Sequence, residues 1–217
     1  MLISTLFFFF KIGITIFKEQ RNMKTVIIYN HPYQGSFCHA ILEATKRGIE
    51  EAGHTVDIID LDKDNFNPVM TDQDLLAFRN HEMLDQQSKD YIKRVKQADH
   101  LVFIFPIWWE LMPAMTKGFI DKVIFPGSAY NYTKSGYGMT TLLSNIKSTT
   151  VITTMNTPKM MYSTIYGNAI SKAMIRGTLK KSGLKNVRWI SFNQVKTSSE
   201  SKRKKWLTRL EKNFSKK

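Results

Sequence analysis

One stretch decides the fold class of this chain: Leu101-Val-Phe-Ile-Phe-Pro-Ile-Trp-Trp-Glu-Leu-Met-Pro-Ala-Met-Thr-Lys-Gly-Phe-Ile-Asp-Lys-Val123. Its first five residues are apolar and β-prone, which is typical of a strand covered on both faces of a parallel sheet. Pro106 and Pro113 then end the strand and begin a helix at its first turn. Trp108 and Trp109 stand between the prolines, and they either cap the core or lie against a planar ring.

Strand and helix patterns alternate along the chain from Met23. Such alternation predicts right-handed crossovers and a parallel sheet with helices on both faces. The 217 residues, 42% of them apolar, allow one sizeable core. We therefore predict a single α/β domain over residues 23–217, with a doubly wound five-stranded parallel sheet in the order 2-1-3-4-5. The expected strands are 25–30, 55–60, 101–105, 149–154 and 187–192, and the expected helices are 37–52, 72–79, 87–97, 114–124, 169–181 and 200–213.

In this order, the connections that follow the first and third strands leave in opposite directions, which creates a crevice where ligands bind in such sheets. Residues 31–36, 106–112 and 155–162 form the loops expected to meet there, and the long connection 125–141 is a further candidate. Ser36 is the expected N-cap of the first helix, so free N–H groups would face the crevice and suit a phosphate. His31 and Ser36 add side-chain donors. The alternative is a plain turn with a helix cap.

Other ligand motifs are absent. The chain has neither G-x-G-x-x-G nor G-K-[ST], which argues against a Rossmann-type dinucleotide site and a nucleoside triphosphatase. Cys38 is a reactive thiol if it is exposed, but packing is the favoured interpretation. One cysteine and no zinc-type cluster indicate a reduced, cytoplasmic protein without a metal. The remaining histidines are interpreted as surface or capping residues: His39, His54, His81 and His100.

The formal net charge of +14 favours polyanions, phosphorylated cofactors and anionic membrane surfaces as partners. Half of this charge lies in residues 196–217. Trp206, Leu207 and Leu210 have helical spacing there, which predicts a docked terminal helix with a solvated basic face. A nucleic-acid-binding protein is the weaker hypothesis because no nucleic-acid motif is present.

The first 22 residues differ from the rest. Their apolar run is short of the roughly 20 residues that a membrane helix needs, and Lys11 interrupts it. No secretory signal pattern surrounds the run. Residues 18–22 can be encoded by purine-rich codons typical of a ribosome-binding site, so we expect translation to begin at Met23. Residues 1–22 would then be a non-native or disordered extension, and a membrane anchor is the alternative.

Three motifs carry a resemblance to a known family. They are His31-Pro…Ser36-Phe37-Cys38, Phe105-Pro-Ile-Trp-Trp…Met112-Pro-Ala-Met-Thr-Lys-Gly118 and Asp121-Lys-Val…Pro126-Gly-Ser-Ala-Tyr130. The chain resembles the flavodoxin-like NAD(P)H:quinone oxidoreductases, that is, the NAD(P)H dehydrogenases (quinone), from Met23 to about Phe214. The resemblance implies a flavodoxin-like fold and tightly bound FAD or FMN in the crevice. It also implies electron transfer from NADH or NADPH to quinones or similar acceptors, in a homodimer without stable membrane insertion.

The resemblance also assigns residues. The flavin phosphate is expected near His31, Phe37 and Cys38, and the flavin ring along Ile107, Trp108 and Trp109, whose backbone N–H groups would lie near its reactive edge. Ser36 and Pro106 are further expected cofactor contacts. Further cofactor contacts are assigned to Thr153, Thr154 and Asn156. Tyr130 and Tyr132 match a pair that covers the substrate, commonly from the second subunit. Tyr162 matches a catalytic tyrosine near a flavin carbonyl.

The chain departs from the family pattern in two places. Met155 and Asn156 replace two glycines beside the ring, and Tyr166 is a loose substitute for the family's histidine. Because a flavin carries out the hydride transfer itself, the protein supplies stacking, orientation and stabilisation of charge, and no catalytic dyad is required. The Tyr162 phenol could donate a hydrogen bond to an anionic ring, or it could simply pack a loop.

A second function stays open at this stage. Some relatives are flavodoxin-like regulatory subunits of membrane ion-efflux systems, in which binding matters rather than turnover. A flavin that bleaches on addition of NAD(P)H and recovers with a quinone would favour the enzyme.

Overall fold

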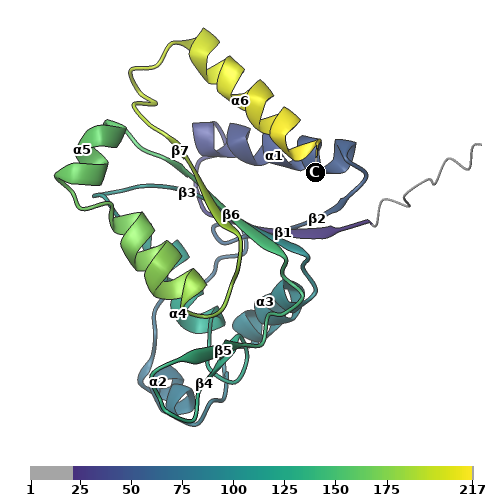
Figure 1. Ribbon diagram of the computed structural model, residues 1–217, viewed down its shortest axis with the longest axis vertical. Coiled ribbons are helices and arrows are strands. Elements are labelled where there is room, and N and C mark those ends of the chain that lie inside the picture. The colour runs from purple at the N-terminus through teal and green to yellow at the C-terminus, as the bar shows by residue number, and fades with distance from the viewer. Residues whose placement is uncertain (1–21, 217) are drawn as a thin grey trace, which may run out of the picture.

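The computed structural model describes residues 22–216, and the expectations for the first 21 residues lie outside this range. The five long strands form one parallel sheet in the order β2-β1-β3-β6-β7 (Figure 1). Because β6 and β7 are the fourth and fifth of these strands along the chain, the expected order 2-1-3-4-5 is confirmed. The strands are β1 (Lys24–Tyr29), β2 (Thr55–Asp60), β3 (His100–Pro106), β6 (Ser148–Thr154) and β7 (Val187–Phe192).

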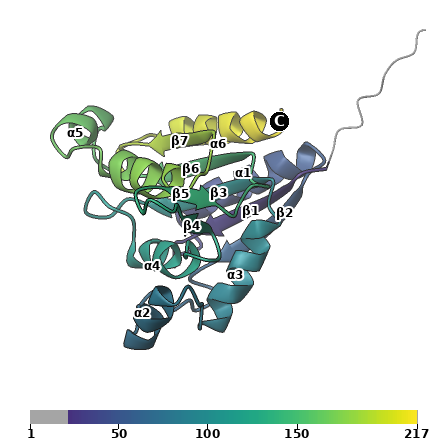
Figure 2. The same cartoon turned by 60° about the horizontal axis from the view of Figure 1, so that its bottom comes forward.

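Helices cover both faces of the sheet (Figure 2). On one face lie α1 (Phe37–Glu51) and α6 (Glu200–Phe214), which pack against each other. Gly48 permits this close approach, since a Cβ there would come within 2.4 Å of the Glu211 carbonyl oxygen. On the other face lie α3 (Gln86–Lys96), α4 (Ala114–Val123) and the π-helix η1 (Ile170–Lys180). Two short helices, α2 (Asp72–Arg79) and α5 (Lys159–Thr164), lie outside these layers.

The central strands divide their side chains between two cores. Val26 and Ile28 of β1 join the cluster under α3, α4 and η1, whereas Ile27 and Tyr29 join the cluster under α1 and α6. Successive side chains of a strand point to opposite faces, so an apolar strand without polar alternation must be covered twice. All seven residues of β3 are buried. The continuous apolar run at 101–105 is thereby explained.

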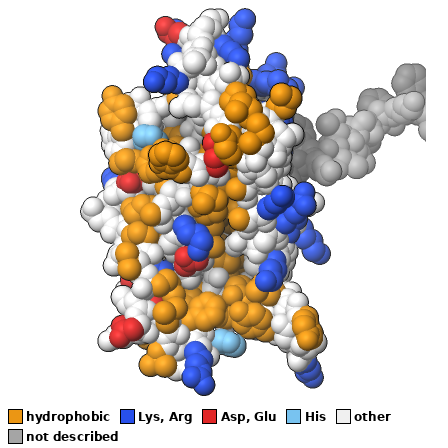
Figure 3. Space-filling view, turned by 90° about the vertical axis from the view of Figure 1, so that its left-hand side faces the viewer, with side chains coloured by type: hydrophobic (Ala, Val, Ile, Leu, Met, Phe, Trp, Pro, Cys, Tyr) orange, Lys and Arg blue, Asp and Glu red, His pale blue; other side chains and the backbone are white. Residues whose placement is uncertain are grey.

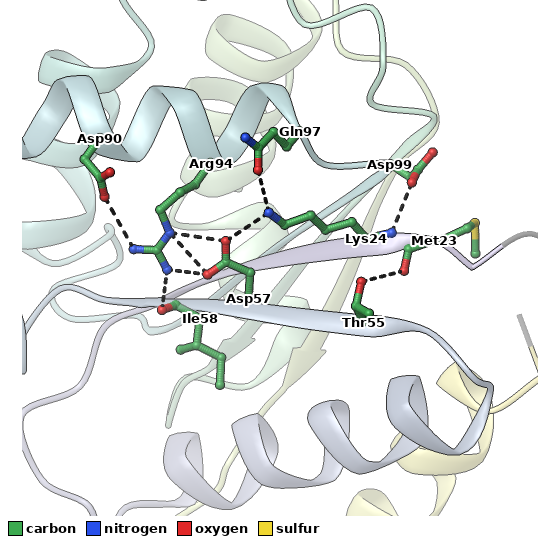
Figure 4. Close-up of polar contacts among 9 residues, drawn as sticks. All are labelled: Met23, Lys24, Thr55, Asp57, Ile58, Asp90, Arg94, Gln97 and Asp99. Carbon is green, nitrogen blue, oxygen red and sulfur yellow. Dashed lines mark hydrogen bonds and ion pairs between the residues drawn. The ribbon is translucent and has the colours of Figure 1, made fainter.

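A charged cluster ties β1 and β2 to α3 (Figure 4). The Arg94 guanidinium pairs with the Asp57 carboxylate and donates to the Ile58 carbonyl at 2.7 Å. Lys24 of β1 lies 3.5 Å from the same carboxylate. Burial acts to raise the pKa of Asp57, but Arg94 and Lys24 outweigh it, and the pKa lies below its usual range. The cluster holds the edge strand in register at the end opposite the crevice.

The structure adds local detail that the sequence did not show. The long connection 125–141 contains an antiparallel hairpin of β4 (Tyr130–Tyr132) and β5 (Met139–Thr141), whose short strands give little periodic signal. Residues 159–164, most of which were expected in a loop, form helix α5, and the helix expected at 169–181 is present as a π-helix. Pro113 is the N-cap of α4 instead of its first helical residue.

Two histidines interpreted as surface or capping residues are buried. His54 and His100 are 7% and 4% exposed. His100 opens β3 between the sheet and α6, where Ser148 and Thr150 contact its two ring nitrogens. A histidine with both nitrogens satisfied in this way packs as a core residue, and a sequence alone does not reveal such partners.

Candidate functional site

A cavity of about 340 Å³ opens at the carboxyl ends of β1, β3 and β6. The three loops expected to meet at this edge do so, and the β7–α6 loop joins them. The crevice forms because the connection after β1 leaves toward α1, while the connection after β3 leaves toward α4 on the opposite face of the sheet. The lining residues are His31, Phe37, Cys38, Pro106, Ile107, Trp108, Thr154, Met155, Asn156, Val195 and Lys196.

His31 leads the first loop with a fixed tautomer. The Tyr33 N–H donates to His31 Nδ1 at 3.1 Å, so the neutral ring carries its proton on Nε2. Burial lowers the pKa of His31, and the Asp62 carboxylate opposes this effect only in part. The neutral imidazole in this tautomer offers its Nε2–H as a donor. Its edge faces the Trp108 ring, with centroids 6.2 Å apart.

The start of α1 presents backbone donors to the cavity. Ser36 is the N-cap, as expected, and its hydroxyl accepts from the His39 N–H at 3.1 Å. Ser36 does not itself line the cavity. Within residues 22–216, the N–H groups of Phe37 and Cys38 find no acceptor. Free first-turn N–H groups and the helix dipole suit a phosphate or another anion.

Cys38 is a packing residue and not a reactive thiol. Its side chain is 2% exposed, and burial raises its pKa to about 11, despite a 3.2 Å hydrogen bond with the Thr154 hydroxyl that acts in the opposite direction. A thiol with this pKa is protonated at neutral pH and has little nucleophilic character. The contact between Cys38 and Thr154 instead joins the end of β6 to the start of α1 beneath the cavity.

The tryptophan loop is a tight two-residue turn. The backbone groups of Trp108 and Leu111 bond reciprocally, with both N···O distances 3.0 Å. The central residues Trp109 and Glu110 have φ of 49° and 63°, which are the left-handed angles of a type I′ turn. Bulky residues rarely adopt such angles, and they persist at functional sites where the surroundings enforce them.

The same turn decides how the tryptophans are presented. Trp108 lines the cavity and is about half exposed, whereas Trp109 lies outside it and is 98% exposed. The Ile107 N–H donates to the Thr154 carbonyl at 2.7 Å and the Trp108 N–H donates to Leu111. These two N–H groups are therefore not available to a ring edge, contrary to the expectation.

Tyr162 lies beneath this turn and does not line the cavity. Its hydroxyl donates to the Glu110 carbonyl at 3.0 Å and accepts from the Ile170 N–H at 3.0 Å. The side chain is 1% exposed, and its burial raises the pKa, against the lowering effect of the Ile170 N–H. In this arrangement the hydroxyl proton is already donated within the protein. The position therefore differs from that expected for a donor to the ring.

The Glu110 side chain also contacts the loop after β6. Its Oε1 accepts from the Thr157 hydroxyl at 2.6 Å, while its buried Oε2 has no partner in the described part of the chain. Together with Tyr162, this contact clamps the turn from below.

The β7–α6 loop completes the cavity, and sequence reasoning missed it. The Lys196 N–H donates to Asn156 Oδ1 at 3.0 Å, and the Val195 N–H donates to the Met155 carbonyl. Lys196 brings the one lysine of the lining and no lining residue is acidic, which suits an anionic ligand. Lys196 begins the basic terminal run, so nothing in the pattern distinguished it from a solvated lysine.

Besides Ser36, Trp109 and Tyr162, three further expected site residues do not line the cavity. Thr153 precedes Thr154 in β6 and therefore points to the opposite face, where it accepts from the Trp189 indole at 3.0 Å. Tyr130 is buried in β4 and lines a separate cavity with Ile120 and Met139. Tyr132 is exposed on the same strand, 5.5 Å from Tyr130 between ring centroids.

The carboxyl edge of the sheet is rich in exposed apolar side chains, which gather on the face shown in Figure 3. This face includes α5 and the tryptophan loop, both at the left of Figure 1. The tryptophan loop, α5 and the two residues after α5 carry exposed large apolar side chains. These are Trp108, Trp109, Leu111, Met160, Ile165 and Tyr166.

A family model described as having a flavodoxin-like fold matches residues 23–214. The chain belongs to this family. An uncharacterised NAD(P)H oxidoreductase of Haemophilus influenzae is 29% identical over 185 residues, which are 84% of this chain and 89% of that protein. The human ribosyldihydronicotinamide dehydrogenase (quinone) is 30% identical over 124 residues, 50% of this chain and 54% of that protein. The resemblance to flavodoxin-like NAD(P)H:quinone oxidoreductases is confirmed.

Two solved structures are similar to the present chain. Smu.1420 from Streptococcus mutans has a TM-score of 0.79 and 32% identity, with 90% of this chain and 100% of that chain covered. The NAD(P)H:quinone oxidoreductase from Methanothermobacter marburgensis has a TM-score of 0.80 and 28% identity, with coverage of 89% and 98%. Both solved structures therefore have the same overall fold as the present chain over nearly their whole length.

The sequence favoured neither a membrane helix nor a metal site. No helix within residues 22–216 has the length and apolar character needed to cross a bilayer. The same residues contain no group of three or more His, Cys, Asp or Glu side chains arranged to hold a metal ion.

Proposed function

We propose that this protein is a flavin-dependent oxidoreductase that transfers two electrons from NADH or NADPH to quinones or similar small acceptors. The observation that carries the proposal is the cavity at the β1/β3 switch point, which is lined both by the first turn of α1, with its free N–H groups, and by Trp108. The free N–H groups suit a phosphate, and the indole suits a planar ring. A flavin mononucleotide unit has both parts, so the residues present fit the cofactor.

The named relatives support this chemistry. The Methanothermobacter marburgensis protein, 28% identical, is named an NAD(P)H:quinone oxidoreductase, and the human relative is named for activity on a quinone. A Bacillus anthracis azoreductase that was solved with FMN is 19% identical, and this likeness supports the fold alone. We propose FMN or FAD as the tightly bound cofactor.

The lining residues divide between the two parts of the proposed cofactor. We propose that the N–H groups of Phe37 and Cys38 and the Nε2–H of His31 hold the phosphate, with Lys196 contributing charge. Trp108, Ile107 and Pro106 would form one wall of the ring site. Thr154 and Asn156 would border it from β6. Bound flavin supplies the hydride chemistry, and the protein positions it and limits the access of water.

Tyr162 receives a changed role in this proposal. Because its hydroxyl is occupied by Glu110 and Ile170, we propose that it positions the tryptophan turn instead of donating to the ring. The expected role of Tyr166 in place of the family histidine stays a prediction. Its side chain is 46% exposed at the end of α5, within the apolar face.

A homodimer is part of the proposal. Trp109 is 98% exposed, and a protein without a partner would gain little from displaying such a side chain beside other apolar residues. Tyr130 and Tyr132 lie on the hairpin, outside the crevice of their own chain, so a second copy is required if they are to cover a substrate. We also propose a cytoplasmic location, which rests on the single buried cysteine.

The test begins with protein purified without added cofactor. The proposal expects a yellow protein whose released cofactor is FMN or FAD by mass spectrometry. Its absorbance near the flavin maximum should fall on addition of NADH or NADPH and return with a quinone. Colourless protein that binds neither flavin at excess would contradict the proposal. The regulatory-subunit alternative expects bound flavin without turnover, together with co-purification of a membrane transporter.

A further inference from the structure

A second cavity, of about 410 Å³, lies between β7 and α6 and shares no lining residue with the first. Its lining comes from β7, an edge strand of the sheet, from the β7–α6 loop and from α6. Lys159, at the start of α5, also lines it. The lining residues are Lys159, Arg188, Ile190, Ser191, Phe192, Asn193, Gln194, Lys202, Trp206, Arg209, Leu210 and Asn213.

The charge of this cavity is of one sign. Lys159, Arg188, Lys202 and Arg209 contribute cations from three different elements, and the lining contains no carboxylate. Nowhere in residues 22–216 does an acidic side chain pair with any of these four. Like charges around one hollow repel one another, and an anion bound between them removes that cost.

The acidic residues of α6 have partners outside the cavity. Glu200 pairs with Lys204 at 2.7 Å, and Glu211 pairs with Arg47 of α1 at 3.0 Å. The cavity cations Lys202 and Arg209 therefore have no acidic partner on their own helix.

The polar and apolar parts of the lining narrow the class of ligand. Arg188 and Arg209 offer planar forks that match phosphate oxygens. The carboxamides of Gln194 and Asn213 form no hydrogen bond in the described part of the chain, so both can meet ring heteroatoms or hydroxyls. Ile190, Trp206 and Leu210 supply an apolar wall. The volume is in the range of small-molecule sites.

We propose that this cavity is a second ligand site, for a nucleoside phosphate, separate from the crevice at the carboxyl ends of the strands. Arg188, Arg209 and Lys202 bind the phosphates, and the apolar wall with Gln194 and Asn213 takes the nucleoside. The volume of the cavity is in the range of small-molecule sites, which favours a small molecule over an extended acidic polypeptide.

The aromatic wall also connects the two cavities. Trp206 and Phe192 pack together at 5.3 Å between ring centroids, and both contact Phe37, at 6.1 and 5.8 Å. Phe37 lines the first cavity. An occupant of the second cavity therefore lies one aromatic layer away from the proposed phosphate end of the first.

The experiment is calorimetric titration of the flavin-loaded protein with ATP, with pyrophosphate and an octaglutamate peptide as comparison probes. We expect ATP to bind, and Arg188→Gln/Arg209→Gln to weaken it by more than about tenfold because two charged phosphate contacts are lost. Lys205→Gln/Lys212→Gln is the matched control, since it removes the same charge from α6 outside this cavity. The control should change the affinity by less than about twofold.

Four outcomes would overturn the proposal. They are the absence of ATP binding, equal weakening by both double variants, retention of full affinity in Arg188→Gln/Arg209→Gln, and tighter binding of octaglutamate than of ATP with the same dependence on the arginines. If the double variant does not fold, Arg188→Gln alone carries the test. The readout is the heat of binding and does not require turnover, so protein that carries no flavin or shows no activity is titrated in the same way.

Discussion

The Tyr162 hydroxyl donates to the Glu110 carbonyl, 3.0 Å away, and thereby ties the helix after β6 to the turn that presents Trp108 and Trp109. The two residues are far apart in sequence, and Glu110 has a positive φ of 63°. The same hydroxyl accepts from the Ile170 N–H, so it bridges two backbone groups that no other side chain serves. A strained turn is held where the proposed ring site needs it.

Tyr162→Phe should lower the free energy of unfolding by about 1–3 kcal/mol, because a buried carbonyl and a buried N–H lose their partner. Flavin affinity should fall with it, while the rate of flavin reduction by NAD(P)H in the loaded fraction stays near that of the parent protein. Urea unfolding and stopped-flow absorbance measure the two effects. Tyr166→Phe, at an exposed tyrosine, is the control. Unchanged stability with slower reduction would instead support the direct catalytic role.

Trp109→Gly should be more stable than Trp109→Ala by about 1 kcal/mol. Both variants lose the indole, but only glycine relieves the left-handed backbone at φ 49°. Chemical unfolding of the pair measures the difference. Both variants should have a lower tendency to dimerise in light scattering if the apolar face is the interface, and an unchanged dimer would contradict that assignment.

Cys38 should resist alkylation at pH 8 and should make stability fall at alkaline pH. Burial raises its pKa from 9.0 to about 11 in the folded protein, so the unfolded chain loses the thiol proton first. Its stabilising effect is complete below pH 9 and is lost as the pH rises to about 11, by up to about 2 kcal/mol. The control is Cys38→Ala, whose stability profile should lack this component. Parallel profiles for the two proteins would refute the assignment.

Arg94→Lys should destabilise the protein by about 1–2 kcal/mol, since lysine cannot reproduce the paired contact with Asp57 or the bond to the Ile58 carbonyl (Figure 4). The pKa of Asp57 lies below its usual range, so this contribution is present at neutral pH and is lost as the pH falls below about 4. Asp90→Asn is the control, because Asp90 is more exposed and lies 3.9 Å from Arg94. A larger effect of Asp90→Asn would contradict the ranking.

Much of the site was accessible from the sequence because a parallel sheet brings the carboxyl ends of its strands to one edge. His31, Phe37, Cys38, Pro106, Ile107, Trp108, Thr154 and Asn156 were expected at the cofactor and all line the first cavity. Thr153 does not line the cavity because it is adjacent to Thr154 in β6, and adjacent strand residues face opposite sides of the sheet. Lys196 was missed because its loop follows β7, a strand whose end was not counted among the converging loops.

The sequence by itself determined the α/β class, the strand order and the edge at which the loops meet, because apolar periodicity and crossover handedness depend on local chain properties. Only the tertiary structure decided which hydrogen-bonding and charged groups already have partners within the protein. The Tyr162 hydroxyl and the Ile107 N–H have partners distant along the chain, while four cations from α5, β7 and α6 share a cavity without a carboxylate. Hydrogen bonding and charge neutralisation depend on distances across the folded molecule, which one-dimensional patterns do not contain.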